Sequence, residues 1–254
     1  KKIMQNYYYT KPTDDVVASK NQNYKLPKDY QIIPTSLSAK LWNYIARTLA
    51  ALFGWGYSRL FLKVHVKGKH KLKLVNQSGY FLYGNHTQPM GDVFTPLTIV
   101  SPYRFYAIAG QANWGIPFIG KYLVRYGGLP VGENLQESAK LIKAIKTLIQ
   151  QKKVIAIYPE AHVWPYYTKI RPFSNTSMHF PVQLKAPSFT MTTTYHKPKF
   201  GKRPKIIIYI DGPFYPDQVL SHKKAQDKLY NKIRETMIER AQTSDYQYCH
   251  YVKK

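Results

Sequence analysis

Acidic residues are scarce in this sequence, which has 13 Asp and Glu against 38 Lys and Arg in 254 residues and a formal net charge of +25. An imbalance of this size exceeds what solubility needs and indicates an anionic partner. Nucleic acid, an anionic membrane and phosphorylated small molecules carry the matching charge. Specific nucleic-acid binding is not expected, because no recognisable nucleic-acid-binding motif is present and the basic residues are dispersed along the chain.

Cysteine is almost absent as well. The single cysteine, Cys249, excludes a disulfide within the chain and fits a reducing compartment, which favours a cytoplasmic location. No Cys/His cluster has the spacing of a zinc site, and no pair of carboxylates suits Mg²⁺. We therefore expect no bound metal.

No hydrophobic run is long enough to cross a membrane. The longest, residues 41–62, contains Arg47 and Arg59, whereas a spanning helix needs about 20 predominantly apolar residues. Its apolar residues recur at helical spacing, and its aromatic residues are of the kind that favours a lipid headgroup layer. The pattern predicts either an interfacial helix or a helix packed on the core. The residues concerned are Leu41, Trp42, Tyr44, Ile45, Thr48, Leu52, Trp55 and Tyr57.

The chain is long enough for one large domain with two N-terminal additions. Residues 1–36 are polar and lack periodicity, which predicts an arm on the surface. Residues 37–62 are predicted to form the amphipathic membrane-associating helix. Residues 63–254 are predicted to form the main domain. In the main domain, runs rich in β-branched and aromatic residues alternate with helical patterns, which is typical of an α/β fold with a mainly parallel or mixed central sheet flanked by helices. The predicted strands lie near residues 62–68, 79–85, 104–110, 153–159, 188–195 and 205–213, and the predicted helices include 138–149 and 229–241.

The best candidate for chemistry is His86, in the stretch YGNHTQPMGDVF. The preceding GYFLYG is typical of a strand, so Asn85 and His86 follow the strand end, where ligands bind in open α/β sheets. Pro89 and Gly91 predict a turn that directs Asp92 back to the imidazole. An aspartate that accepts the Nδ1 proton leaves Nε2 free to act as a general base. The alternative is a structural histidine that holds the turn.

Two motifs resemble those of the glycerolipid acyltransferases. Asn85 and His86, five intervening residues and Asp92 resemble the family's first motif, which has four residues between the His and the Asp. The later stretch AIYPEAHVW, with Glu160 after a predicted strand, resembles the family's Phe-Pro-Glu-Gly-Thr motif. The resemblance covers roughly residues 79–212.

The resemblance implies an acyltransferase. Such an enzyme moves a fatty acyl group from a thioester donor, either acyl-CoA or an acyl carrier protein, to a hydroxyl of a lysophospholipid or glycerol-phosphate-type acceptor. It needs no cofactor beyond this co-substrate. It uses the histidine as the base and the aspartate as its partner, here His86 and Asp92.

The candidate substrate-binding residues depart in part from the family. An arginine that helps to bind the acceptor phosphate in the family has no counterpart in the GGLPVGEN stretch of this chain. Glu160 is predicted either to bind acceptor hydroxyls or to pair with a basic residue, and the loop after it, with Trp164, is predicted to be an aromatic and basic rim or a loop over the core. The predicted substrate-binding residues are Asn85, Arg125, Lys140, Glu160, His162 and Arg171.

The surplus of lysine suits a polyanionic donor and an anionic membrane together. We therefore expect a peripheral or monotopic protein at the cytoplasmic face of a membrane. The alternative is a non-catalytic basic protein that binds membranes or nucleic acid.

Overall fold

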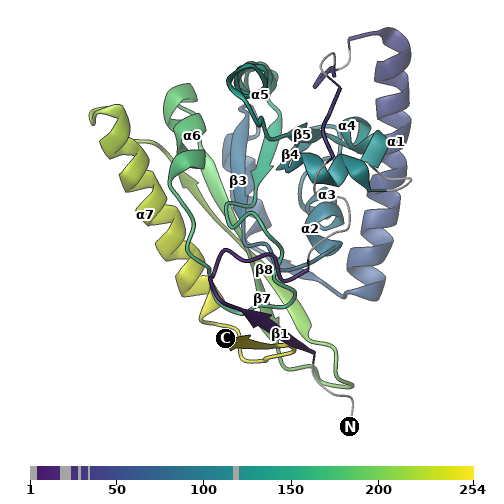
Figure 1. Ribbon diagram of the computed structural model, residues 1–254, viewed down its shortest axis with the longest axis vertical. Coiled ribbons are helices and arrows are strands. Elements are labelled where there is room, and N and C mark those ends of the chain that lie inside the picture. Colours follow the sequence, from purple (N-terminus) through teal and green to yellow (C-terminus); the bar gives the residue numbers. More distant parts are fainter. Residues whose placement is uncertain (1–4, 18–23, 28–29, 34, 117–119) are drawn as a thin grey trace.

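The computed structural model describes residues 5–17, 24–27, 30–33, 35–116 and 120–254. Within these ranges the main sheet has seven strands in the order β2-β8-β7-β3-β6-β4-β5 (Figure 1). Every neighbouring pair is parallel except β7 and β8. This arrangement confirms the predicted α/β fold with a mainly parallel sheet. The strands are β2 (His65–Lys67), β3 (Tyr80–Gly84), β4 (Phe105–Ala109), β5 (Gly128–Pro130), β6 (Val154–Ile157), β7 (Ser188–His196) and β8 (Lys205–Phe214).

Helices cover both faces of the sheet (Figure 1). One face packs against α5, α6 and α7, and the other packs against α2 and α3 and the 3-10 helix η2. The bounds are α2 (Gly91–Phe94), α3 (Pro96–Ile99), α4 (Leu123–Tyr126), α5 (Leu135–Gln150), α6 (His179–Leu184), α7 (His222–Ala241) and η2 (Lys69–Val75), with short 3-10 turns at η3 (Gln111–Gly115), η4 (Gly120–Tyr122) and η5 (Thr176–Met178).

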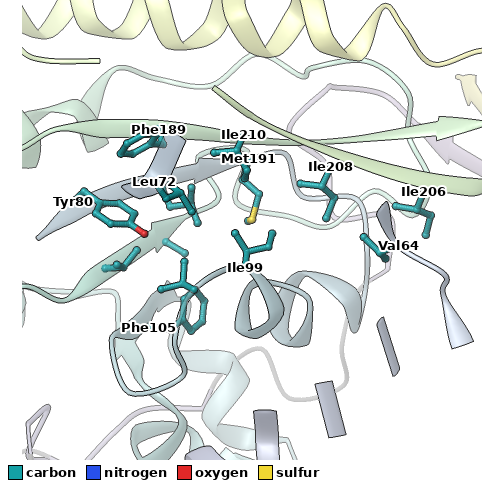
Figure 2. Packing of buried hydrophobic residues seen from close by; sticks show 14 of the residues in the cluster. Val64, Leu72, Tyr80, Ile99, Phe105, Phe189, Met191, Ile206, Ile208 and Ile210 are labelled. Atoms are coloured by element: carbon teal, nitrogen blue, oxygen red, sulfur yellow. The ribbon is translucent and has the colours of Figure 1, made fainter. Parts of the chain in front are cut away.

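The core on the α2 and α3 side is built from large apolar side chains of β7 and from isoleucines of β8. Figure 2 shows Met191, Ile208 and Ile210 of the sheet above Ile99 of α3. Val64, which precedes β2, closes one end of this cluster and is 3 % exposed. The period-2 alternation of β8 explains the arrangement, because every second residue of the strand points to the same face. This core fixes α3 against the sheet.

The helix α1 (Leu37–Gly56) carries its large apolar side chains on the side that faces away from the protein. Its buried side is formed by Arg47 and Gly54. The Arg47 guanidinium donates to the carbonyls of Pro102 and Phe105, and a Cβ at Gly54 would lie 2.9 Å from the carbonyl oxygen of Phe94. A surface helix usually turns its apolar stripe toward the core, whereas the apolar stripe of α1 faces outward. Its exposed apolar residues are Leu37, Leu41, Trp42, Tyr44, Ile45, Leu49, Leu52, Phe53 and Trp55.

A π-helical turn, η1 (Tyr57–Phe61), follows α1 and leads into β2. Leu60 and Phe61 of this turn are 67 % and 51 % exposed, so they extend the outward apolar surface of α1. Among the helices of the described ranges, none has both the length and the hydropathy to span a bilayer.

The N-terminal arm contributes a strand that its sequence does not predict. Its strand β1 (Asn6–Tyr9) pairs in parallel with β9 (His250–Lys253), forming a separate two-stranded sheet beside the C-terminus (Figure 1). Parts of the predicted arm, residues 1–4, 18–23, 28–29 and 34, lie outside the described residues.

Candidate active site

The site begins where β3 ends. Asn85, the first residue after the strand, is 2 % exposed and binds the neighbouring strand β7. Its Nδ2 donates to the carbonyl of Thr193 over 3.0 Å, and its Oδ1 accepts the N–H of Thr193 over 2.8 Å. Both ends of the amide are therefore engaged. The structure gives Asn85 a structural role, because its side chain joins β3 to β7. Its contact with substrate stays a prediction.

His86 and Asp92 meet as the turn chemistry predicts. The Nδ1 atom of His86 lies 2.8 Å from Oδ2 of Asp92, which is the hydrogen-bonding distance of an oriented imidazole. The same Oδ2 accepts the N–H of Gln88 over 2.9 Å, so it is fixed from two sides. The His86 side chain is 24 % exposed and the Asp92 side chain 5 %. Among the described residues no protein atom bonds Nε2 of His86, which leaves that nitrogen available at the carboxyl end of the strands.

The loop between His86 and Asp92 is held by the end of β7. The hydroxyl of Tyr195 lies 2.7 Å from Oγ1 of Thr87 and accepts from Nε2 of Gln88 over 2.8 Å. Tyr195, Thr87 and Gln88 are all buried. The five-residue spacing is thus accommodated by a loop that is fixed on β7 before α2 begins.

Tyr158, at the end of β6, contacts both members of the pair. Its ring stacks on the imidazole of His86, with centroids 4.8 Å apart and planes 26° apart. Its hydroxyl donates to the backbone carbonyl of Asp92 over 2.6 Å. That carbonyl has no helical donor four residues on, because Pro96 lacks an N–H. Burial, with the charge of Asp92 adding to it, raises the pKa of Tyr158 well above its ordinary value, so the phenol stays protonated and donates.

Glu160 is a buried support of His86. One carboxylate oxygen accepts the backbone N–H of His86 over 3.0 Å, and the other accepts the N–H of Arg171 over 2.8 Å. The Arg171 guanidinium lies 3.3 Å from the first oxygen, and both side chains are at most 2 % exposed. Burial raises the pKa of Glu160, while the charge of Arg171 and the two N–H donors oppose the rise. Of the two predicted roles, the structure has the pairing with a basic residue.

Arg171 is buried and makes further contacts with the chain. Its Nη1 donates to the carbonyl of Pro12 over 3.2 Å, and its Nη2 donates to the carbonyl of His162. Its guanidinium covers the ring of Trp164 at 4.8 Å, and its buried Nε has no hydrogen-bond partner among the described residues. The structure thus places Arg171 in a buried scaffold beside Glu160, and its contact with substrate stays a prediction.

The loop after β6 is covered by the two ends of the chain. Trp164 is 1 % exposed and stacks on Tyr251 of β9, with centroids 4.9 Å apart, and its Nε1 donates to the carbonyl of Asp14 over 2.8 Å. The N–H of Trp164 in turn donates to the carbonyl of His86 over 2.9 Å. At Trp164 the predicted aromatic and basic rim is thus a buried layer. This layer connects the N-terminal arm to the loop that begins at His86.

The remaining predicted ligands do not gather at His86. Arg125 lies in α4 just before β5, toward the opposite end of the parallel strands, and its Nη1 is buried. Lys140 is exposed on α5, in the helix layer on the other face of the sheet from α2. The side chain of His162 is 46 % exposed and its Nδ1 lies 3.6 Å from Asp15. The predicted set therefore divides into the His86 and Asp92 pair, a buried scaffold, and residues elsewhere on the surface.

A small cavity lies beside Asp92. Leu62 and Val64 from the entry to β2, and Met191 and Ile206 from β7 and β8, line it together with α2. Its volume of about 10 Å³ admits a water molecule and is too small for a fatty acyl chain. No group of three or more His, Cys, Asp or Glu in the described parts of the chain is placed to hold a metal ion.

Comparison with known proteins identifies the family. A family model described as Acyltransferase matches residues 63–194, just over half of the chain. The crystal structure of the 1-acyl-sn-glycerophosphate (LPA) acyltransferase, PlsC, from Thermotoga maritima is similar in fold, with a TM-score of 0.57 and 16 % sequence identity over 84 % of this chain and 86 % of that one. No curated protein matches in sequence. His86, Asp92 and Glu160, from the two motifs that resemble those of the family, lie inside the matched range, and the chain belongs to the acyltransferase family.

Proposed function

We propose that this acyltransferase moves a fatty acyl group from a thioester donor, acyl-CoA or an acyl carrier protein, to a hydroxyl of a lysophosphatidate or glycerol-phosphate-type acceptor. The observation that carries the proposal is the 2.8 Å contact between Nδ1 of His86 and Asp92, with Nε2 left unbonded by the described protein atoms. Family membership supports acyl transfer. The acceptor class is supported by the activity named for the similar Thermotoga maritima structure.

In the proposed reaction, His86 accepts the proton of the acceptor hydroxyl at Nε2. The acceptor oxygen attacks the thioester carbonyl carbon, a new C–O bond forms, and the C–S bond breaks. The thiolate leaves and takes up the proton from the imidazolium. Asp92 holds the Nδ1–H tautomer and stabilises the positive charge that forms on the ring. No covalent intermediate on the protein and no cofactor beyond the donor are needed.

The expected contributions have different sizes. General base catalysis by His86 contributes about 10²–10⁴-fold. Orientation of the acceptor against the thioester contributes several kcal/mol more, and it depends on the stack of Tyr158 and on the backbone support from Glu160. The small cavity beside Asp92 has to widen before an acyl chain occupies it.

The exposed face of α1 supports a membrane location. Its exposed face carries Leu41, Trp42, Leu49, Leu52 and Trp55, each more than half exposed. An apolar helix face with aromatic residues lies in the headgroup layer of a bilayer, and the net charge of +25 favours an anionic one. We place the protein at the cytoplasmic face as a peripheral or monotopic enzyme.

The experiment that tests the reaction compares the protein with His86→Ala. Purified protein is incubated with labelled acyl-CoA or acyl carrier protein and a panel of lysolipid and glycerol phosphate acceptors. The matched control is His65→Ala, because His65 is an exposed histidine of β2. We expect His86→Ala to lose about 10²–10⁴-fold in kcat and His65→Ala to retain activity. Full activity of His86→Ala would overturn the mechanism and favour a non-catalytic role for the site.

A further inference from the structure

The connection between β7 and β8 exposes an aromatic side chain among positive charges. Phe200, near the tip, is 93 % exposed. The stretch from 197 to 205 contains no acidic residue. Gly201 has a φ of +77°, a left-handed conformation that glycine adopts without strain, and it lets the chain reverse directly after Phe200. The exposed basic residues of this hairpin are Lys197, Lys199, Lys202, Arg203 and Lys205.

The hairpin is held in place by the segment after α7. The hydroxyl of Tyr246 donates to the carbonyl of Lys202 over 3.0 Å, and the carboxylate of Asp245 accepts the N–H of Lys197 over 2.8 Å. The first contact lies beside the turn and the second at the base of the hairpin, and both leave the side chain of Phe200 exposed. The exposure of Phe200 is therefore a feature of an anchored hairpin.

The hairpin continues the apolar surface of α1 and η1. The guanidinium of Arg203 lies 4.3 Å from the ring centroid of Phe61, the last residue of η1. Phe61 and its neighbour Leu60 are exposed on their other sides. The cation–π contact between Arg203 and Phe61 thus joins the hairpin to the apolar surface of α1 and η1.

This combined surface lies at the catalytic end of the sheet. Residue 196 ends β7 at the carboxyl end of the parallel strands, the same end at which His86 leaves β3 (Figure 1). Leu62, directly after η1, and Ile206, directly after the hairpin, both line the cavity beside Asp92. A surface that contacted both segments would face the entrance to the site.

We propose that the β7–β8 hairpin is a second membrane-binding element, in which Phe200 enters the headgroup layer of an anionic bilayer while the surrounding lysines bind lipid phosphates. The inference rests on the proposed membrane association of α1 and assigns a new contact to it. Aromatic residues favour the interface, and each basic side chain near an anionic surface contributes about 1 kcal/mol, which is about a fivefold change in affinity. With α1 and the hairpin both docked, the carboxyl end of the sheet is turned toward the lipid surface.

A bilayer fits this surface better than nucleic acid does. The lysines of the hairpin would suit either polyanion, but the adjacent Leu60, Phe61 and the exposed face of α1 offer apolar area that a phosphate backbone would leave in water. A bilayer provides both the charge and the apolar layer.

Vesicle binding by hairpin variants tests the proposal. The full chain, Phe200→Ser and the double variant Lys199→Gln/Lys202→Gln are titrated with vesicles of phosphatidylcholine and phosphatidylglycerol, and with phosphatidylcholine alone. The matched control is Val219→Ser, because Val219 is 95 % exposed in the loop that precedes α7, at the other end of β8. We expect binding to anionic vesicles to weaken about tenfold for Phe200→Ser and about 25-fold for the double lysine variant, with no change for the control. Circular dichroism verifies that each variant is folded.

A thiol label tests insertion directly. The only cysteine, Cys249, is buried and burial raises its thiol pKa to about 11, so an environment-sensitive maleimide dye will react with a thiol introduced by Phe200→Cys. We expect the emission of the dye to shift to the blue on addition of anionic vesicles. The same dye introduced through Val219→Cys should show no shift.

The outcomes separate this inference from the proposed function. If the full chain binds anionic vesicles and the hairpin variants bind them equally well with no dye shift, the hairpin proposal is overturned while α1 remains the membrane element. If the full chain binds no vesicles, both membrane statements fail. Weaker binding of single-stranded DNA by the hairpin variants, with vesicle binding unchanged, would assign the hairpin to nucleic acid instead. His86→Ala run in parallel isolates the chemistry, because it should lose transfer and keep vesicle binding.

Discussion

The phenol ring of Tyr158 lies over the imidazole of His86, 4.8 Å away, and its hydroxyl binds the backbone carbonyl of Asp92. One side chain thereby fixes the position of His86, the proposed base, and the position of Asp92, its proposed partner. The carbonyl needs this donor because the helical donor is missing at Pro96.

Two substitutions separate these contacts. Tyr158→Phe keeps the stack and removes the hydrogen bond, so we expect kcat to fall about tenfold. Tyr158→Leu removes both, and we expect a loss of about 10²-fold with little change in KM. Steady-state kinetics on both variants measure the effect, and equal activity of all three proteins would contradict a positioning role.

Asp92→Asn tests the partner of the base. The carboxylate accepts both from His86 and from the N–H of Gln88, and an amide cannot stabilise the imidazolium in the same way. We expect a loss of about 10²–10⁴-fold in kcat with the fold intact. Asp227→Asn is the matched control, because Asp227 is a carboxylate of α7 that contacts Asn175 on the other face of the sheet. Comparable losses in the two variants would show that the effect is not specific to the pair.

Glu160→Gln should mainly affect stability. It leaves the buried guanidinium of Arg171 without its counter-charge, and breaking a buried pair in this way costs about 3–5 kcal/mol. Asp217→Asn breaks an ion pair with Lys228, whose side chain is 65 % exposed, and should cost far less stability, because solvent screens exposed ion pairs. Denaturant unfolding of both variants gives the comparison. A small and equal loss of stability in both variants would mean that water reaches the pair of Glu160 and Arg171 in solution.

Asp211 predicts an acid-sensitive contribution to stability. Hydrogen bonds from Arg240, and then from Lys71, hold its pKa below the ordinary value of 3.8. Because the folded pKa lies below the unfolded one, the contribution is complete above the unfolded value and is lost as the pH falls through the folded value. Asp211→Asn should therefore be about 1–2 kcal/mol less stable at neutral pH and lose less stability than the parent between about pH 5 and pH 2. The free energy of unfolding of both proteins is measured against pH. Equal losses in the parent and in Asp211→Asn over this range would refute the prediction.

The main sheet was predictable because most of its strands are indicated by the residue types of their own short segments. The β-branched and aromatic runs that become β3, β6, β7 and β8 each form a buried strand within a residue or two of the expected bounds. The strand β5 (Gly128–Pro130) was not predicted, since it is short and contains residues that disfavour strands. The pairing of β1 with β9 depends on a contact between opposite ends of the chain, which local pattern does not reveal.

The candidate site was predictable only where its contacts are local. His86 and Asp92 are joined through one turn, and the proline and glycine in that turn indicate it. Asn85 and Arg171 have partners in β7 and in the N-terminal arm, so the sequence gives no sign that their polar atoms are occupied. Tyr158 is another missed residue, although its position in the motif resembling Phe-Pro-Glu-Gly-Thr could have identified it.

For α1 the helical pattern was predictable but its orientation was not. The sequence left open whether the apolar side faces the core. Arg47 decides the matter, because its guanidinium needs the carbonyls of Pro102 and Phe105 and the ring of Tyr106, which lie on the protein side.

The parallel pairing of β1 with β9 has a consequence for biosynthesis. During translation β1 leaves the ribosome long before its partner strand exists, so it must stay unpaired until residues 250–253 emerge. Tyr251 of β9 is also the ring that covers Trp164, whose backbone holds the carbonyl of His86. The nascent chain can thus build its main sheet before β9 emerges, but the surroundings of His86 are completed only after residue 251 has been synthesised.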